Sequence, residues 1–120
     1  MKRIFLLIIV FTILSCTKSI NIEGFNQNEW QQDKNGCEGI RSTMTKTILG
    51  IKSELLGLDT DEVISVLGRP NKTILGERSQ KKFIYNISPI ESCENHSTEK
   101  ETKLFIRFNA VGLAYEIIIN

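Results

Sequence analysis

The spacing of the apolar residues changes at Pro70, and this change most constrains what the chain can fold into. After Pro70, apolar and polar residues alternate with a period of two, which is typical of half-buried β-strands. Before it, the spacing predicts one apolar face of a helix over residues 39–56. The apolar residues there recur at steps of four, four, three and four: Ile40, Met44, Ile48, Ile51 and Leu55.

A second, shorter helix is predicted by the segment GLDTDEVISVLGRP, residues 57–70. Asp59 can cap its first turn, with Glu62 as the reciprocal partner of a capping box. Gly68 is a typical helix end, and Pro70 prevents the helix from continuing.

Three clear strands and one weaker strand follow. The clear ones are KKFIYNIS (81–88), KLFIRFN (103–109) and LAYEIIIN (113–120), and the weaker one covers about 72–77. In the last strand, the odd-numbered residues Leu113 to Ile119 are expected to share one face, opposite Ala114, Glu116 and Ile118. The sequence NAVG before it predicts a hairpin turn. We therefore expect an α+β fold of two layers over residues 36–120, in which two N-terminal helices pack on a three- to four-stranded antiparallel β-meander.

The N-terminus has the pattern of a secretory signal. Lys2 and Arg3 precede a run of apolar residues from Ile4 to Leu14, which is too short for a membrane span of about 20 residues. A buried strand or helix of a cytosolic domain is the alternative. The terminal position and the polar sequence after Cys16 favour a signal peptide over residues 1–15.

The end of this segment, Ile13-Leu14-Ser15-Cys16, resembles the lipobox of bacterial lipoproteins. The resemblance implies that the Cys16 thiol carries diacylglycerol, that the chain is cut before Cys16, and that this amine gains a further acyl chain such as palmitate. Two or more chains hold a protein stably on a bilayer. Because Thr17, and not Asp, follows Cys16, the resemblance favours the outer membrane, and the absence of an acidic cluster favours its periplasmic face.

Lipidation of Cys16 leaves two cysteines, Cys37 and Cys93. In an oxidising compartment such a pair predicts one disulfide, closing a loop of about 57 residues with a stabilisation of roughly 4 kcal/mol. Two free thiols are the alternative. A metal site at Cys93 and His96 has weak support, because the chain has no other histidine. His96 is expected to be an exposed loop residue.

Residues 16–35 are mostly polar and are expected to form a lipid-anchored flexible tether. Trp30 is the exception, and it can either pack on the domain or anchor a partner. Removal of the leader reduces the 15 basic residues to 13, against 14 acidic ones. This nearly neutral chain lacks the basic footprint of a nucleic-acid-binding protein, so no nucleic acid is expected.

The order of the motifs resembles the SmpA/OmlA (BamE-like) group of small outer-membrane lipoproteins. Their pattern G-x-[ST]-x-x-x-V-x-x-x-[LI]-G-x-P is followed by an aromatic strand and by F-[DN]-x-x-G. The long helix, the cysteine pair and Asp59 depart from that pattern. The residues that fall on it are Gly57, Val63, Leu67, Gly68, Pro70, Phe108, Asn109 and Gly112.

These observations predict a non-catalytic lipoprotein that binds other envelope proteins, and the resemblance implies support of outer-membrane assembly or integrity. The candidate partner surface is an exposed apolar patch that includes Trp30, Phe105 or Ile118. No catalytic motif, cofactor or metal is expected apart from the covalent lipid on Cys16. The alternative is a small-ligand binding protein or an inhibitor-like module of an envelope enzyme.

Overall fold

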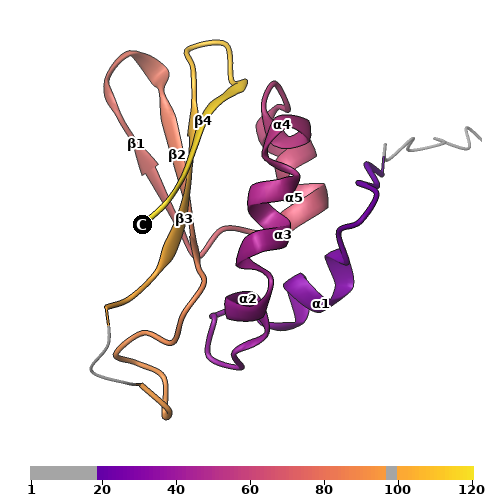
Figure 1. Ribbon diagram of the computed structural model, residues 1–120. Coiled ribbons are helices and arrows are strands. Elements are labelled where there is room, and N and C mark those ends of the chain that lie inside the picture. The colour runs from indigo at the N-terminus through magenta and orange to yellow at the C-terminus, as the bar shows by residue number, and fades with distance from the viewer. Residues whose placement is uncertain (1–18, 97–99) are drawn as a thin grey trace, which may run out of the picture.

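The computed structural model describes residues 19–96 and 100–120 and has an α+β fold in two layers. Helices cover one face of an antiparallel four-stranded sheet, and the other face is open (Figure 1). The predicted signal peptide (1–15) and the lipid attachment at Cys16 lie outside the described residues.

The sheet is a meander in which each strand pairs with the next along the chain, in the order β1-β2-β3-β4. Antiparallel pairing of successive strands, as the alternation of apolar residues predicts, is confirmed. A short 3-10 turn, η1 (Glu77–Ser79), connects the first two strands. The strands are β1 (Lys72–Leu75), β2 (Lys81–Asn86), β3 (Lys103–Phe108) and β4 (Ala114–Ile119).

The faces of β4 differ from the prediction at its start. The register shifts between Arg107 and Phe108, so that Arg107 pairs with Glu116 but Phe108 pairs with Ala114. The extra residue is Tyr115, and such a bulge reverses the faces on one side of it. Ala114 is therefore buried beside Phe108, while Tyr115 is exposed. The predicted alternation holds only after the bulge, where Ile117 is buried and Ile118 is exposed.

The long helix predicted over 39–56 is present as three short segments, α2 (Ile40–Thr43), α3 (Thr45–Gly50) and α4 (Lys52–Leu55). The prediction of one continuous helix is wrong, but its apolar face is correct: Met44, Ile48, Ile51 and Leu55 are buried. Hydroxyl side chains compete with the helical hydrogen bonds here. Thr43 Oγ1 donates to the Ile40 carbonyl at 2.6 Å, and Thr45 Oγ1 donates to the Ser42 carbonyl at 3.0 Å.

The shorter helix, α5 (Thr60–Leu67), has the predicted capping box. The Glu62 backbone N–H donates to Asp59 Oδ1 at 2.8 Å, and the Asp59 N–H donates to Glu62 Oε2 at 3.0 Å. The helix ends at Gly68, whose φ of +75° favours glycine.

A further helix, α1 (Gln27–Gln32), lies in the segment that was expected to be a tether. Its Trp30 is completely buried, and the indole Nε1 donates to the carbonyl of Leu67 at 3.1 Å. Gln31 Nε2 donates to the Val66 carbonyl at 3.2 Å. The last carbonyls of a helix have no partners within it, so α1 supplies partners at the end of α5. Residues 19–35 therefore do not form the free tether predicted over 16–35, and the folded unit begins before Gly36.

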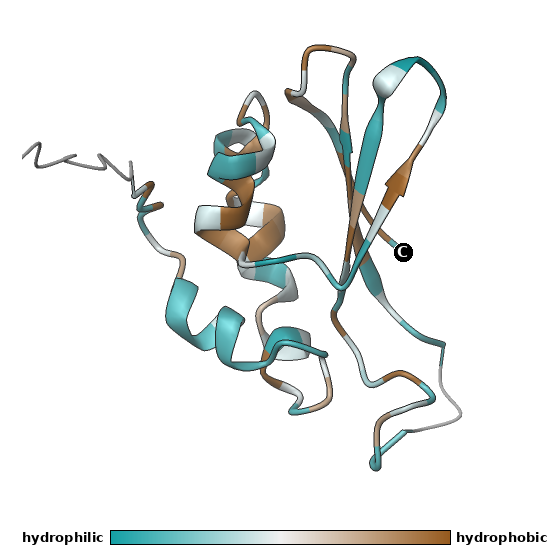
Figure 2. Ribbon diagram, turned by 180° about the vertical axis from the view of Figure 1, so that it is seen from behind, coloured by the Kyte–Doolittle hydropathy of each residue, from teal (hydrophilic) through white to brown (hydrophobic). Residues whose placement is uncertain are grey.

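The core lies between the helices and the sheet. Figure 2 shows the apolar residues concentrated in α3, α5 and the strands, whereas α1 is mostly hydrophilic and contributes mainly Trp30. Phe83 and Phe108 form the closest aromatic pair, with ring centroids 4.7 Å apart. The fully buried aliphatic residues of this core are Ile48, Leu55, Val63, Val66, Leu67, Ile87, Leu104 and Ile106.

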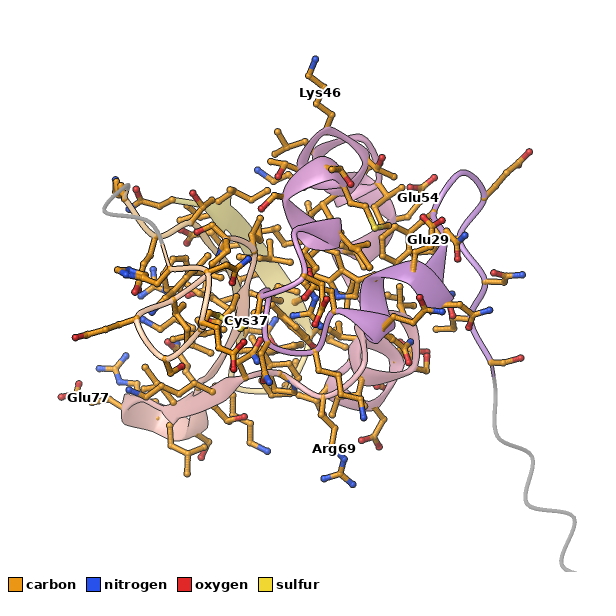
Figure 3. The ribbon with its side chains drawn as sticks, turned by 90° about the horizontal axis from the view of Figure 1, so that it is seen from below. Glu29, Cys37, Lys46, Glu54, Arg69 and Glu77 are labelled. Carbon is orange, nitrogen blue, oxygen red and sulfur yellow. A yellow bond between two sulfur atoms is a disulfide. The ribbon has the colours of Figure 1, made fainter. Side chains whose placement is uncertain are left out.

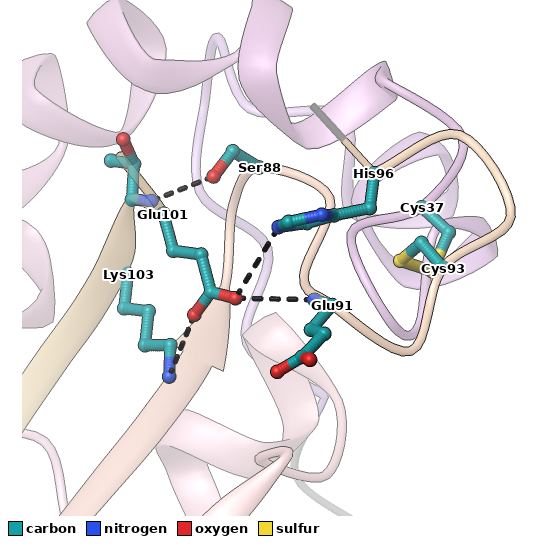
Figure 4. Close-up of polar contacts among 8 residues, drawn as sticks. Cys37, Ser88, Glu91, Cys93, His96, Glu101 and Lys103 are labelled. Atoms are coloured by element: carbon teal, nitrogen blue, oxygen red, sulfur yellow. Dashed lines mark hydrogen bonds and ion pairs between the residues drawn. A yellow bond between two sulfur atoms is a disulfide. The ribbon is translucent and has the colours of Figure 1, made fainter. Parts of the chain in front are cut away.

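A disulfide between Cys37 and Cys93 connects the two layers, with a Cα–Cα distance of 5.6 Å. It joins the segment before α2 to the long connection between β2 and β3 (Figure 4). Asn95 Nδ2 also donates to the Cys37 carbonyl, at 2.8 Å. The connection is thus held against the helix layer by a covalent bond and by a hydrogen bond.

Candidate functional site

The open face of the sheet carries a row of apolar side chains across three strands. Ile84, Phe105 and Ile118 are register partners on β2, β3 and β4. Cross-strand partners lie within about 5.5 Å of each other, so the three side chains form one continuous row. Ile84 is buried, Phe105 is partly exposed, and Ile118 is 42% exposed.

Charged residues flank this row. Lys82 and Arg107 are register partners in the next row, and the Lys82 Nζ lies 5.6 Å from the centre of the Phe105 ring. Arg107 Nη1 contacts Glu116 Oε2 at 3.4 Å. Lys72 pairs with Ile84 at the edge of the apolar row. This surface therefore has an apolar centre with an excess of cations around it.

The structure brings together only two of the three residues predicted to form the partner surface. Phe105 and Ile118 are neighbours on the open face, whereas Trp30 is fully buried on the opposite side of the sheet. The inclusion of Trp30 in that surface is wrong, because its indole contacts Phe25, Tyr85 and the end of α5.

β4 is an edge strand of the sheet. At its start, Ala114 is hydrogen-bonded on its free side to Gly57 and Leu58. Farther along, antiparallel alternation places the N–H and C=O groups of Ile117 and Ile119 on the free side. No residue of the described chain hydrogen-bonds to these groups from that side. A free edge of this kind can pair with a strand from another chain.

One end of the molecule exposes further apolar side chains that the sequence did not single out. The tips of the β1–β2 and β3–β4 hairpins lie together there (Figure 1). Leu75 is 71% exposed and Val111 is 78% exposed. Val111 belongs to the predicted turn NAVG, whereas Leu75 ends β1, and the sheet topology brings the two turns together.

On the helix side, Arg41 is a buried charge surrounded by polar partners. It is 1% exposed. Its Nε donates to the Trp30 carbonyl at 3.0 Å, and its Nη1 contacts Asn71 Oδ1 and the Asn86 carbonyl, each at 3.2 Å. The guanidinium also lies over the Trp30 ring, 4.6 Å from its centre. This burial was not predicted from the sequence.

Asp33 lies near this arginine, but its carboxylate binds backbone groups. Its Oδ1 accepts from the Glu38 N–H at 2.9 Å, and its Oδ2 accepts from the Arg41 N–H at 3.0 Å. These bonds satisfy donors at the start of α2. Burial lowers the pKa of Arg41, and the nearby Asp33 and Tyr85 oppose that shift. Burial also raises the pKa of Tyr85, which the charge of Arg41 partly opposes.

A cavity of about 400 Å³ opens beside Arg41, between α1, the end of α5 and the start of β1. Three cationic residues line it and no acidic residue does. The complete lining is Gln31, Lys34, Asn35, Arg41, Leu67, Gly68, Arg69, Pro70 and Asn71.

The connection between β2 and β3 has its own polar cluster around Glu101 (Figure 4). Glu101 Oε1 accepts from the Glu91 N–H at 3.1 Å and lies 4.0 Å from His96 Nε2, while Glu101 Oε2 lies 3.6 Å from Lys103 Nζ. His96 is an exposed loop residue, as predicted. These contacts hold the connection in its conformation, so the cluster has a structural explanation.

Within residues 19–96 and 100–120, no group of three or more His, Cys, Asp and Glu side chains is arranged to hold a metal ion. The helices of these same ranges are all too short or too polar to cross a bilayer.

Comparison with known proteins adds no relative to this description. No family model matches the chain, and neither a curated protein nor a solved structure is significantly similar to it.

Proposed function

We propose that this chain is a non-catalytic lipoprotein of the bacterial outer membrane that faces the periplasm and binds another envelope protein through the open face of its sheet. The lipobox at Ile13–Cys16 and the resemblance to the SmpA/OmlA group support the location. The resemblance also supports a role in outer-membrane assembly or integrity.

The observation that carries the proposal is the apolar row Ile84, Phe105 and Ile118, which runs to an edge strand whose free-side backbone groups have no partner among the described residues. A partner strand that pairs with β4 gains backbone hydrogen bonds, and its alternate side chains extend the apolar row. The flanking Lys72, Lys82 and Arg107 favour acidic residues beside that strand.

The lipid anchor adds to the affinity of such a contact. Two proteins confined to one membrane meet at a high effective concentration, so a modest interface is sufficient for stable association.

Site-specific photo-crosslinking in intact envelopes tests the proposal. A photo-reactive residue at Ile118 should crosslink to an envelope protein, whereas one at Lys46, which projects from the helix layer (Figure 3), should not. Cys16→Ser should abolish palmitate labelling and reduce the Ile118 crosslink. Equal crosslinking from Ile118 and Lys46, or no crosslink from Ile118, would contradict a partner on the open face.

A further inference from the structure

The cavity beside Arg41 is a second place where this domain can bind a molecule. We propose that it binds the carboxylate or phosphate group of a small molecule, with the guanidinium of Arg41 as the main contact. This inference is independent of the partner proposed for the open face of the sheet, because the cavity lies on the helix side.

The hydrogen bonds of Arg41 leave part of its guanidinium free. An arginine side chain has five N–H donors. Its Nε donates to the Trp30 carbonyl, and its Nη1 contacts two acceptors, Asn71 Oδ1 and the Asn86 carbonyl. Nη2 has no hydrogen-bond partner among the described residues. Because no side-chain nitrogen of the described residues is both fully enclosed and without a partner, Nη2 keeps a small exposed surface, and Arg41 lines the cavity.

The position of the guanidinium is fixed in advance. Three hydrogen bonds hold it, and the rings of Trp30 and Tyr85 lie 4.6 and 5.9 Å from it. A donor that is already held in place loses little side-chain entropy when a ligand binds. Charge-assisted hydrogen bonds from arginine to an oxyanion are also stronger than those between neutral groups.

The charges around the cavity favour an anion over a cation. Lys34, Arg41 and Arg69 line it, and no acidic residue does. Arg69 extends from the rim into solvent (Figure 3), so it contributes long-range attraction in this conformation. Asp33, the carboxylate whose charge acts on Arg41, accepts two backbone N–H groups and forms no ion pair with the guanidinium within 4.0 Å.

The size of the cavity indicates more than an inorganic ion. At about 400 Å³ it lies within the usual range of small-molecule sites. Leu67 and Pro70 provide apolar wall, Gln31 offers an amide group, and Asn35 lies at the exposed edge of the lining. A ligand with an anionic end at Arg41 and a small polar or apolar remainder fits this lining.

Nuclear magnetic resonance on the folded protein tests the site. The Nε–H of Arg41 is buried and hydrogen-bonded, so its resonance can be followed during titration with inorganic phosphate, acetate or citrate at constant ionic strength, with chloride as the reference. The expected result is a saturable shift with at least one of the three anions. Comparison of the phosphate titration with the acetate and citrate titrations distinguishes a phosphate-selective from a carboxylate-selective site. Equal responses to chloride and to all three anions would overturn the proposal.

A pair of variants at Asn35 separates binding in the cavity from surface effects. Asn35 is exposed and lines the cavity, so Asn35→Trp should fill the opening without disturbing the core. It should weaken the binding at least about tenfold, which corresponds to about 1.4 kcal/mol. The control Asn35→Ala should bind as the wild type does, and unchanged binding in Asn35→Trp would place the anion elsewhere.

The variant Arg41→Lys tests the guanidinium itself. It keeps the charge but cannot satisfy the Trp30, Asn71 and Asn86 acceptors together. If the variant folds, as judged by the fluorescence of Trp30, it should lose the anion response. If it does not fold, the Asn35 pair still decides the question.

Crosslinking from Ile118 should be unchanged in Asn35→Trp, so the failure of one proposal leaves the other intact.

Discussion

The two faces of the sheet are built from the same strands but have different physical roles. On the inner face, Phe83, Ile106 and Ile117 are buried beneath the helices. On the outer face, Phe105 and Ile118 remain partly exposed between charged residues. Burial of apolar surface stabilises a fold, whereas an exposed apolar row gains free energy only when something covers it. The inner face thus accounts for stability, and the outer face is available for binding.

The largest effect should come from the inner face. Phe108→Ala removes a fully buried ring that packs edge-on against Phe83, and it should lower the free energy of unfolding by about 3–5 kcal/mol. Chemical denaturation followed by the fluorescence of Trp30, the only tryptophan, measures this. The control Val111→Ala, at an exposed turn tip, should change stability little. Equal losses in the two variants would contradict the division between the two faces.

The link between the layers should have the next largest effect. Replacing Cys37 and Cys93 by alanine removes the disulfide, which closes a long loop, and should cost about 2–4 kcal/mol. Denaturation of the oxidised and reduced wild type should give the same difference. If reduction leaves the unfolding midpoint unchanged, the connection between β2 and β3 does not depend on this bond.

Tyr85 gives the inner face a pH dependence. Its hydroxyl donates to the Gly68 carbonyl at 2.9 Å, so Tyr85→Phe should cost about 1 kcal/mol at neutral pH. Burial, opposed in part by Arg41, raises the pKa of Tyr85 above its ordinary value of 10.0. Above pH 10 the unfolded chain therefore loses this proton while the folded chain keeps it, and the free energy of unfolding should fall as the pH rises.

The same denaturation experiment at several alkaline pH values checks this prediction. Tyr85→Phe should show a smaller decline above pH 10 than the wild type does. Tyr115→Phe, at an exposed tyrosine, should change the stability at neutral pH by no more than about 0.5 kcal/mol. An identical alkaline decline in Tyr85→Phe and the wild type would show that Tyr85 does not contribute.

The smallest effect on stability is expected on the outer face. Ile118→Ala should change the free energy of unfolding by only about 0.5 kcal/mol. Its neighbour Ile117 points to the inner face, and Ile117→Ala should cost about 2–5 kcal/mol. Of the two, Ile118→Ala should weaken binding to the proposed envelope partner without loss of folding. Similar stability losses at the two positions would mean that the strand is covered on both faces.

Much of the fold could be predicted because its signals are local. The capping box of Asp59 and Glu62 depends on residues three apart, and the strand alternation depends on every second residue. The break of the helix at Met44 was less visible, because apolar spacing is the same whether or not threonine hydroxyls compete for the backbone. The cap at Asn26, which accepts from the Glu29 N–H, was a local sign of α1.

The sequence by itself predicted the apolar face over residues 39–56, the capped helix that follows it and the order of the strands, since these depend on spacing, and it favoured a bond between Cys37 and Cys93. Only the tertiary structure decided that Trp30 is buried, that a bulge turns Ala114 inward, and that Arg41 lies beside a cavity. The reason is the distance along the chain: Trp30 contacts Leu67, and Arg41 contacts Asn86, across separations of 37 and 45 residues. No periodicity within a segment contains that information, because such contacts exist only when the helices have packed on the sheet.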